Sequence, residues 1–297
     1  MLAESTVQES MTKPSNPHIE NAKNIFKRLK KNKAAMVGGF LILLFILTAF
    51  IGPFLVPYGA GEQNLVNKLQ GPSAEHWFGT DHLGRDIFSR IIHGMSITLY
   101  IGFFSVFIAA IFGVVIGIVS GYYGGKIDTL LMRLMDVLLA FPGILLALGV
   151  VTILRPNLNN VILAVAVFSV PAFARIVRGS TLAVKELEYI DAVRALGAGD
   201  VRIIFRHILP NVFSPIIVQA TLRIATAILT AAGLSFLGLG AQPPTPEWGA
   251  MLSDGRNYIF DAGHVALFPG LAIVVVVLAF NIFGDGLRDA LDPKMKS

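Results

Sequence analysis

Long apolar stretches alternate along the chain with shorter stretches that hold nearly all of its charged residues. A transmembrane helix needs about 20 mostly apolar residues, because the hydrocarbon core of a bilayer is about 30 Å thick. Six stretches of this sequence approach or exceed that length: residues 34–56, 97–121, 130–154, 156–174, 212–240 and 265–284. The pattern therefore predicts an all-α integral membrane protein with six transmembrane helices.

The composition also indicates a membrane protein. The 24 basic and 19 acidic residues are only 14% of the 297-residue chain, and 54% of its residues are hydrophobic. Soluble domains carry about 25% charged residues, which form a polar surface that is missing here. This composition excludes a cytosolic enzyme, a disordered protein and a nucleic-acid binder. The absence of cysteine excludes disulfides and cysteine-based metal sites.

The distribution of Lys and Arg predicts the orientation in the membrane. With a cytosolic N-terminus, the cytosolic stretches hold 18 of the 24 basic residues and the outside stretches hold five. Cytosolic loops are enriched in Lys and Arg, so both termini are expected on the cytosolic side. Residues 1–24 are expected to form a polar cytosolic tail, and the basic run at 27–33 is expected to lie against anionic headgroups. The first span is too long for a signal peptide and is expected to remain as an anchor.

No motif in the sequence supports an enzyme. The stretch closest to a P-loop has Ser120 in place of the first glycine and Ile127 in place of the Ser or Thr that binds magnesium. A G-x-S-x-G motif is absent, because Leu237 takes the place of its last glycine. The six histidines form no HxxxH or HExxH pair. The sequence therefore predicts no catalytic residue, no metal site and no cofactor in this chain.

Three residues within the predicted spans are candidates for gating or for lining a path: Asp136, Pro142 and Arg223. Pro142, like Pro171 in the next span, removes a backbone hydrogen bond and is expected to kink its helix. Asp136 is expected to pair with Arg133 near the cytosolic face. For Arg223 two interpretations stay open. One is a structural ion pair or snorkelling to the inner surface, and the other is contact with a gate or a substrate.

Small residues recur every four positions in the second span: Ser105, Ala109, Gly113, Gly117 and Gly121. Residues at this spacing share one face of a helix, and small side chains let a neighbouring helix approach closely in lipid. The row therefore predicts tight helix packing. Its partner is either another helix of the same chain or a second subunit that slides against it.

Residues 183–210 are predicted to form two short helices on the cytosolic side. The first is predicted to end at Gly197, and Asp200 is expected to cap a second helix that ends before Pro210. An apolar stripe on the first helix suits a groove on a cytosolic partner, and the alternative is a helix that lies on the membrane surface. The stripe consists of apolar residues at every third position: Val184, Leu187, Ile190, Val193 and Leu196.

The same segment resembles the EAA loop of the inner-membrane subunits of ABC importers, whose pattern is E-A-A-x-x-x-G-x9-I-x-L-P. Gly197 and the pair Leu209-Pro210 fit this pattern. Three positions depart from it, because Asp, Val and His stand where Glu, the second Ala and Ile are expected. The resemblance implies that an ATPase subunit binds this loop, through residues drawn from Glu188, Asp191, Ala192, Val193, Gly197, Asp200, His207, Leu209 and Pro210.

Three further stretches, at residues 76–90, 235–249 and 280–293, closely resemble the C-type permeases of dipeptide, oligopeptide, glutathione and nickel ABC importers. The resemblance extends over about residues 25–295. It implies the type I importer permease fold, in which one N-terminal helix precedes a five-helix core. The implied parts are an N-terminal segment at 25–75, a core at 95–286 that contains the 183–210 loop, and a cytosolic C-terminus at 287–297.

The resemblance also implies a function. The chain would be a permease subunit that forms half of the path of an importer for di- or oligopeptides in a bacterial or archaeal cytoplasmic membrane. Glutathione and nickel are alternative cargoes. The implied partners are a paralogous B-type permease, two cytosolic ABC ATPases that bind ATP and magnesium, and an extracytoplasmic substrate-binding protein. The rival class is an ion-coupled transporter or channel that acts without an ATPase. Ion coupling would need several intramembrane carboxylates, and only Asp136 qualifies.

Two outside segments are candidates for docking the binding protein. Residues 87–95 carry an apolar face opposite a polar one, which predicts an amphipathic helix on the outer membrane surface. In the last outside loop, Thr245 is expected to cap a helix that starts at Pro246. The alternative is that both segments only anchor their loops. The candidate docking residues are Asp81, Arg85, Asp86, Glu247 and Trp248.

Overall fold

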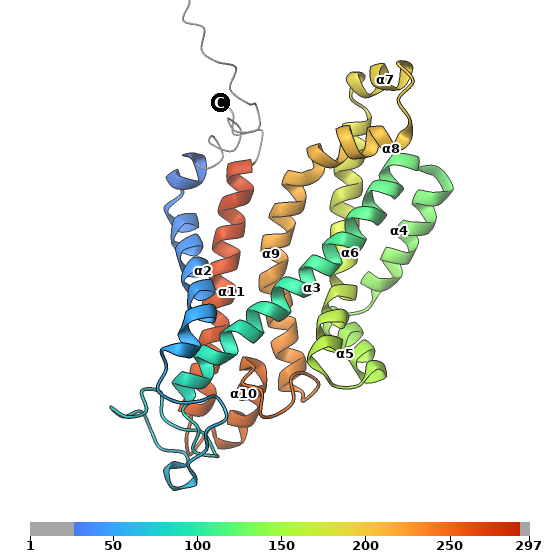
Figure 1. Cartoon of the computed structure of the whole chain (residues 1–297). Helices are drawn as coiled ribbons and strands as arrows, with labels where there is room; N and C mark the ends of the chain where they lie inside the picture. Colours follow the sequence, from blue (N-terminus) through green and yellow to red (C-terminus); the bar gives the residue numbers. More distant parts are fainter. Residues whose placement is uncertain (1–26, 292–297) are drawn as a thin grey trace, which may run out of the picture.

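The computed structural model describes residues 27–291, and within them it contains helices and loops but no strand (Figure 1). The expected tail at 1–24 and the last residues of the expected C-terminal segment, 292–297, lie outside this range. The longer helices are α2 (Lys33–Ile51), α3 (Ile87–Tyr123), α4 (Gly125–Ala140), α5 (Gly143–Leu154), α6 (Leu158–Lys185), α9 (Leu209–Phe236) and α11 (His264–Leu291). The short ones are η1 (Gly52–Phe54), η2 (Leu65–Asn67), α7 (Glu188–Ala195), α8 (Asp200–Ile203), η3 (Ile204–Ile208), α10 (Trp248–Gly255) and η4 (Arg256–Tyr258).

The all-α membrane fold is confirmed, with one difference in the third span. Between residues 27 and 291, five helices are long and apolar enough to cross a membrane, and the bent pair α4 and α5 makes a sixth span if it is counted as one. These two helices meet at 93°. The break lies at Pro142, because the preceding residue, Phe141, takes the extended backbone that a residue before proline prefers. The expected kink is therefore a full break, whereas Pro171 lies inside an uninterrupted α6.

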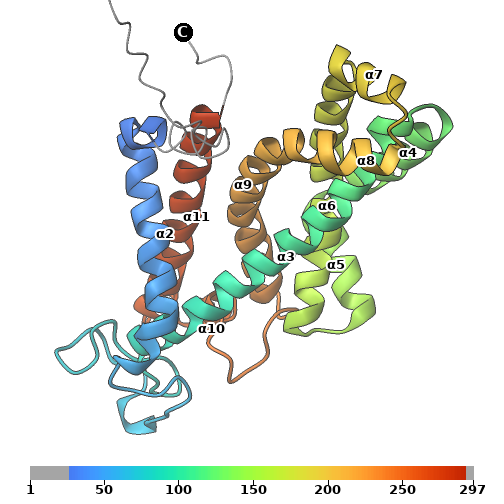
Figure 2. The same ribbon diagram turned by 45° about the horizontal axis from the view of Figure 1, so that its top comes forward.

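Several helices extend beyond their predicted bounds. The 37 residues of α3 correspond to about 55 Å of helix, well over the thickness of a hydrocarbon core of about 30 Å. Accordingly α3 crosses the molecule obliquely in both ribbon views, whereas α2 and α11 lie side by side (Figures 1 and 2). The fourth span, expected at 156–174, is the longer helix α6.

The start of α2, the end of α11 and helices α7 and α8 lie at the same end of the molecule, the upper end in Figure 1. The basic stretches 27–33, 126–133 and 175–206 belong to these elements or to helix ends beside them. The positive-inside rule assigns this end to the cytosol. We call it the inner end, and the opposite end, with α10 and the long loop between α2 and α3, the outer end.

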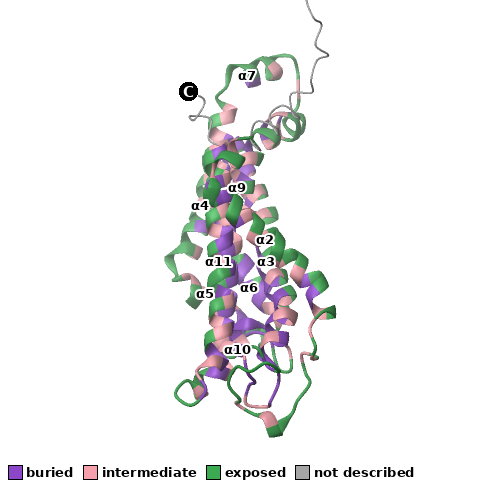
Figure 3. Ribbon diagram, turned by 90° about the vertical axis from the view of Figure 1, so that its left-hand side faces the viewer, coloured by how far each residue is buried: buried purple, intermediate pink, exposed green. Residues whose placement is uncertain are grey.

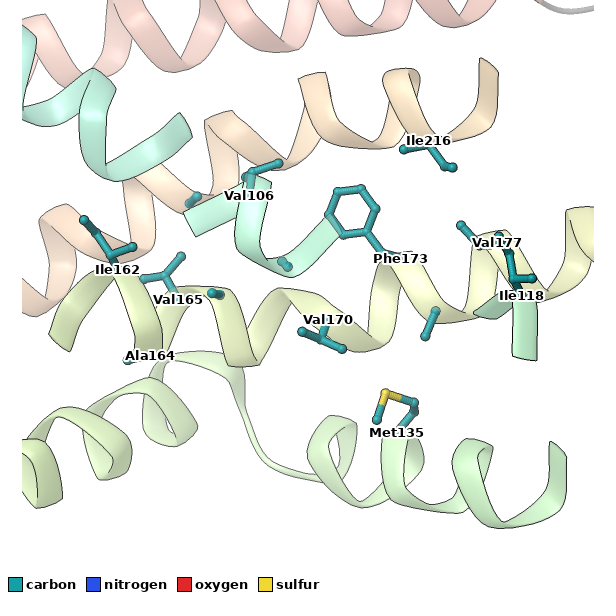
Figure 4. Close-up of a cluster of buried hydrophobic side chains, with 14 of the residues drawn as sticks. Val106, Ile118, Met135, Ile162, Ala164, Val165, Val170, Phe173, Val177 and Ile216 are labelled. Atoms are coloured by element: carbon teal, nitrogen blue, oxygen red, sulfur yellow. The ribbon is translucent and has the colours of Figure 1, made fainter. Parts of the chain in front are cut away.

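The largest contact between helices is that of α3 with α6. The row of small residues in α3 faces α6, so the partner of this row lies within the chain. A Cβ added at Gly117 would lie 2.7 Å from the carbonyl oxygen of Ala174 and 2.7 Å from Cβ of Val177. Figure 4 shows the core around this contact, with Phe173 of α6 among apolar side chains of neighbouring helices and Met135 of α4 pointing toward α6.

A second buried cluster lies at the outer half of the molecule, where α3, α9, α10 and α11 meet around Trp248. In the view coloured by burial, buried residues run through the centre of the molecule from this region toward the inner end (Figure 3). The outward faces of the long helices are exposed, as expected of surfaces that contact lipid or other subunits. The two clusters hold the helices around α3.

We expect Gly117→Ala to destabilise the protein, because the added methyl group must push the α3 and α6 backbones apart. Overpacking of this kind costs about 1–3 kcal/mol. Gly149→Ala in α5 is the matched control, since no atom lies within 4 Å of a Cβ added there. Thermal denaturation of the purified protein in detergent measures the difference. Equal midpoints for the two variants would contradict the packing role of Gly117.

Candidate functional site

The segment between α6 and α9 forms the tip of the inner end (Figure 1). Two expectations for it were wrong. The chain leaves the helix after Lys185 and begins α7 at Glu188, so the predicted apolar stripe is divided between two helices. The second helix does not end before Pro210, because α8 and a π-helical turn continue directly into α9. The π turn ends two residues before this proline, which has no N–H for an ordinary helical hydrogen bond.

The end of α7 at Gly197 is confirmed, and its geometry is that of a Schellman motif. The N–H of Gly197 donates to the carbonyl oxygen of Arg194 over 2.9 Å, and the N–H of Ala198 donates to that of Val193 over 3.3 Å. The motif needs a left-handed residue at its second-last position, and Gly197 has φ +84°. No atom lies within 4 Å of a Cβ added at Gly197, so the backbone conformation alone requires glycine there.

The apolar side chains of this tip divide into a buried and an exposed set. Ile190, Ile203 and Ile208 are fully buried and fix the tip to the main core. Three others point away from the chain, with exposed fractions of 88% for Leu196, 69% for Val201 and 65% for Phe205. We call these three residues the 196–205 patch. A large apolar patch at the surface marks a contact with another protein or with lipid.

Polar contacts fix the tip to the end of α3. The Tyr122 hydroxyl donates to Oδ1 of Asp200 over 2.7 Å, and Nζ of Lys185 donates to the Tyr122 carbonyl oxygen over 2.7 Å. Asp200 is therefore not the expected N-cap. That position belongs to Gly199, and Asp200 is the first residue of α8.

The other predicted coupling residues lie around the 196–205 patch. Asp191 accepts a hydrogen bond from Arg194 one turn later in α7. The backbone oxygen of His207 accepts one from Asn211. Most of the predicted residues are exposed, and Val193, His207 and Leu209 are half-buried. The exposed ones are Glu188, Asp191, Ala192, Gly197, Asp200 and Pro210.

The outer end holds a buried charged network. Asp81 lies 2.6 Å from Nε of Arg85 and 3.7 Å from Nε of Arg90. Asp86 accepts a hydrogen bond from the N–H of Ser89 and so caps α3, and its other oxygen lies 3.0 Å from Nδ1 of His76. All of these charged side chains are buried, and all except Arg90 belong to the loop between α2 and α3. Residues 87–95 are the first turns of α3 and do not form a separate surface helix.

Glu247 and Trp248 are buried as well. The Glu247 carboxylate accepts hydrogen bonds from the N–H groups of Gly249 and Ala250, so Glu247 and not Thr245 caps α10. Burial raises the pKa of this carboxyl, and the two backbone donors only partly oppose the shift. Nε1 of Trp248 donates to the carbonyl oxygen of Ile91 over 3.0 Å and joins α10 to α3. The chain itself covers Asp81, Arg85, Asp86, Glu247 and Trp248, and their part in docking a binding protein stays a prediction.

Charged side chains also lie between α4 and α6, toward the inner end. Asp136 pairs with Arg175 over 2.5 Å, and not with Arg133 as expected. The pair is about half exposed and lines a hollow with Arg178 and Met132. Arg178 forms two hydrogen bonds, of 2.5 and 2.6 Å, with the carboxylate of Asp128, which also accepts one from Ser120. These bonds join α4 to α3 and α6.

The family of the chain follows from comparison with known proteins. Residues 113–297 match the family described as binding-protein-dependent transport system inner membrane component. Residues 22–72 match the N-terminal TM domain of oligopeptide transport permease C. The chain belongs to this permease family.

Similar relatives cover nearly the whole permease. The dipeptide transport system permease protein DppC of Alkalihalophilus pseudofirmus is 57% identical over 272 residues, which are 92% of this chain and 90% of the relative. The glutathione transport system permease protein GsiD of Pectobacterium atrosepticum is 53% identical over 276 residues, 93% of this chain and 92% of the relative. The fold resembles a chain of the MetNI methionine ABC transporter in an inward-facing conformation, with a TM-score of 0.58, 21% identity, and coverage of 69% of this chain and 98% of the other.

The permease is thus a multi-pass inner-membrane subunit of a bacterial ABC transporter complex, in which partner ATPases hydrolyse ATP. Members of this family carry no cofactor of their own. Sequence reasoning missed the contacts of Tyr122, Asp128 and Arg175 at the inner end. Tyr122 and Asp200 are separated by 78 residues, and no periodic pattern links them.

We expect Glu247→Ala to destabilise the outer end, because two buried N–H groups lose their acceptor. Loss of an N-cap costs about 1–2 kcal/mol. Glu247→Gln is the intermediate case, since its amide oxygen can accept from one of the two N–H groups, which in Glu247 donate to different oxygens, and its NH2 cannot accept from the other. Thermal denaturation of the purified permease compares the two. If alanine were tolerated as well as glutamine, the capping role of Glu247 would be refuted.

Proposed function

We propose that this permease forms half of the translocation path of an ATP-driven importer for di- or oligopeptides, and that segment 183–210 couples it to a cytosolic ATPase. The observation that carries the coupling role is the 196–205 patch, which is exposed although the residues beneath it are fully buried. A flexible lipid anchor would not need such a fixed support. A rigid apolar projection of this kind fits a groove on a folded partner.

The coupling follows from the continuity of the helices. ATP binding closes the ATPase pair and moves the tip, and hydrolysis resets it, so that the path opens to each side in turn. The tip is joined to two long helices, because Asp200 accepts a hydrogen bond from Tyr122 of α3, and α8 continues through the π turn into α9. Displacement at the tip is therefore transmitted into α9 and α3. Asp136, Pro142 and Arg223 are the residues that we propose for gating or for lining the path.

The complex that we propose contains a paralogous B-type permease, two ABC ATPases and an extracytoplasmic binding protein. Residues 95–286 form the core, and residues 25–75 add the N-terminal helix and the start of the outer loop. The binding protein docks on the outer end, whose loop shape is held by the buried network of Asp81, Arg85 and Asp86. These three residues act indirectly, through the shape of the loop.

Peptides are the first choice of cargo, because a relative at 57% identity belongs to a dipeptide system. Glutathione, itself a tripeptide, is the second candidate, because relatives at 53% identity belong to glutathione systems. Nickel is the third. An ion-coupled transporter that works without an ATPase is the rival class, and the same experiment distinguishes it.

We expect the complete complex in proteoliposomes to take up labelled alanyl-alanine only when ATP, both permeases, the ATPases and the binding protein are present. The permease alone should give no uptake. Competition with unlabelled glutathione and nickel tests the alternative cargoes. Uptake by the chain alone without ATP would overturn the proposal in favour of a self-sufficient transporter.

We expect Gly197→Ala to weaken ATPase binding, because an L-residue in the left-handed region costs about 1–2 kcal/mol and shifts the 196–205 patch. Gly199→Ala is the matched control. It also has open space around its added Cβ, but its φ is −72°. The amount of ATPase that copurifies with the inserted permease is the measurement. Equal binding by both variants would count against the coupling role of the α7 turn.

A further inference from the structure

A polar stripe runs along one face of α9 inside the apolar part of the molecule. Gln219, Arg223, Thr226 and Thr230 follow one another at spacings of four, three and four residues, which places them on one face of a helix. Thr226 is exposed, and the other three are half-buried. The stripe is about 17 Å long at 1.5 Å per residue. A polar surface of this length is longer than one pair of oppositely charged side chains would need.

The depth of the stripe makes it unusual. Arg223 lies about 20 Å from each end of α9, given the bounds of that helix. The hydrocarbon core is about 30 Å thick, so a residue near the middle of a span lies about 15 Å from either surface, which is beyond the reach of an arginine side chain. Ionisable residues at such a depth face a bundle interior or a water-filled cavity. The first interpretation of Arg223, snorkelling to the inner surface, thus becomes the weaker one.

The stripe holds one cation that the described part of the chain leaves unpaired. The Thr230 hydroxyl donates to the carbonyl oxygen of Thr226 over 2.9 Å, so this threonine is satisfied within its own helix. No acidic or hydrogen-bonding partner for Arg223 is present among residues 27–291. A guanidinium offers five donors and no acceptor. The partner that suits it is a carboxylate, which it binds through two parallel hydrogen bonds.

We propose that the α9 stripe lines the translocation path and that Arg223 binds the carboxylate at the C-terminus of a peptide in transit. The inference rests on the proposed function. A carboxylate of the partner permease could pair with Arg223. It would not explain the polar side chains that continue the stripe over two further turns. Threonine hydroxyls and a glutamine amide provide donors and acceptors for peptide groups along such a track.

The position of the stripe connects this binding site with the ATPase contact. Two residues of the 196–205 patch, Val201 and Phe205, lie on the same helical run as Arg223, residues 200–236, which contains the π turn at 204–208. Displacement of the patch therefore moves Arg223 as well. The carboxylate is held in one state of the transport cycle and released in the other.

The first test compares the uptake of alanyl-alanine with that of its C-terminal amide by the complete complex. The binding protein discriminates between the two equally in every variant, so a change in the uptake ratio belongs to the permease. We expect Arg223→Gln to lower the preference for the free carboxylate by about tenfold. Arg223→Lys should keep most of the preference, and Arg133→Gln, which removes an exposed arginine of α4, should keep all of it.

An unchanged ratio in Arg223→Gln overturns the inference while ATP-dependent uptake by the unaltered complex still supports the proposed function. Uptake that needs no ATP would overturn the proposed function itself. The ratio is measured within each variant, so partial loss of assembly does not affect it.

A second test does not depend on uptake by Arg223→Gln and applies if that variant transports nothing. The chain has no cysteine, so Thr226→Cys introduces a single thiol. We expect a charged, membrane-impermeant thiol reagent to label it in the assembled complex, and alanyl-alanine to slow the labelling. Leu43→Cys is the control, an exposed apolar position in the middle of α2, and should stay unlabelled. Absence of labelling at Thr226→Cys would mean that the partner permease covers the stripe, and would overturn the inference.

Discussion

The close approach of α3 to α6 is the contact on which the other parts of the molecule depend. Lipid provides no hydrophobic force between helices, so they associate through van der Waals packing and polar contacts. Glycines at 113, 117 and 121 leave room for the α6 backbone directly against α3. This contact also brings Tyr122, at the end of α3, next to Lys185, at the end of α6. The tip between α6 and α9 is built on that junction.

Helix α4 is held in a different way. Met135 is its only buried residue, and two ion pairs, Asp128 with Arg178 and Asp136 with Arg175, join it to α6. An element with few apolar contacts moves at a lower free-energy cost than a helix packed in the core. The break at Pro142 separates α4 from α5. In the third span, α4 is thus held mainly by ion pairs beside the closely packed helices α3 and α6. Such an arrangement suits a transporter that must change its conformation.

The two ends of the permease use charge and apolar surface in opposite ways. At the outer end, carboxylates and guanidinium groups are buried and paired, and they fix the loop between α2 and α3 to the start of α3. At the inner end, isoleucines are buried and other apolar side chains are exposed on a fixed tip. The helix from Asp200 to Phe236 then joins that tip to the polar stripe of α9. In the function that we propose, this helix is the mechanical route from the ATPases into the membrane.

The sequence by itself determined the membrane class, the apolar segments and the glycine turn at the tip. These features depend on composition, on helical periodicity and on a residue with positive φ, all of which are local. The positions of charged side chains were decided only by the tertiary structure. Asp136 pairs with Arg175 and not with its sequence neighbour Arg133. Asp81, Arg85 and Asp86 are buried where the sequence suggested an exposed docking surface. A charge pairs with whatever partner the packing of distant helices brings near, and no local pattern encodes that partner.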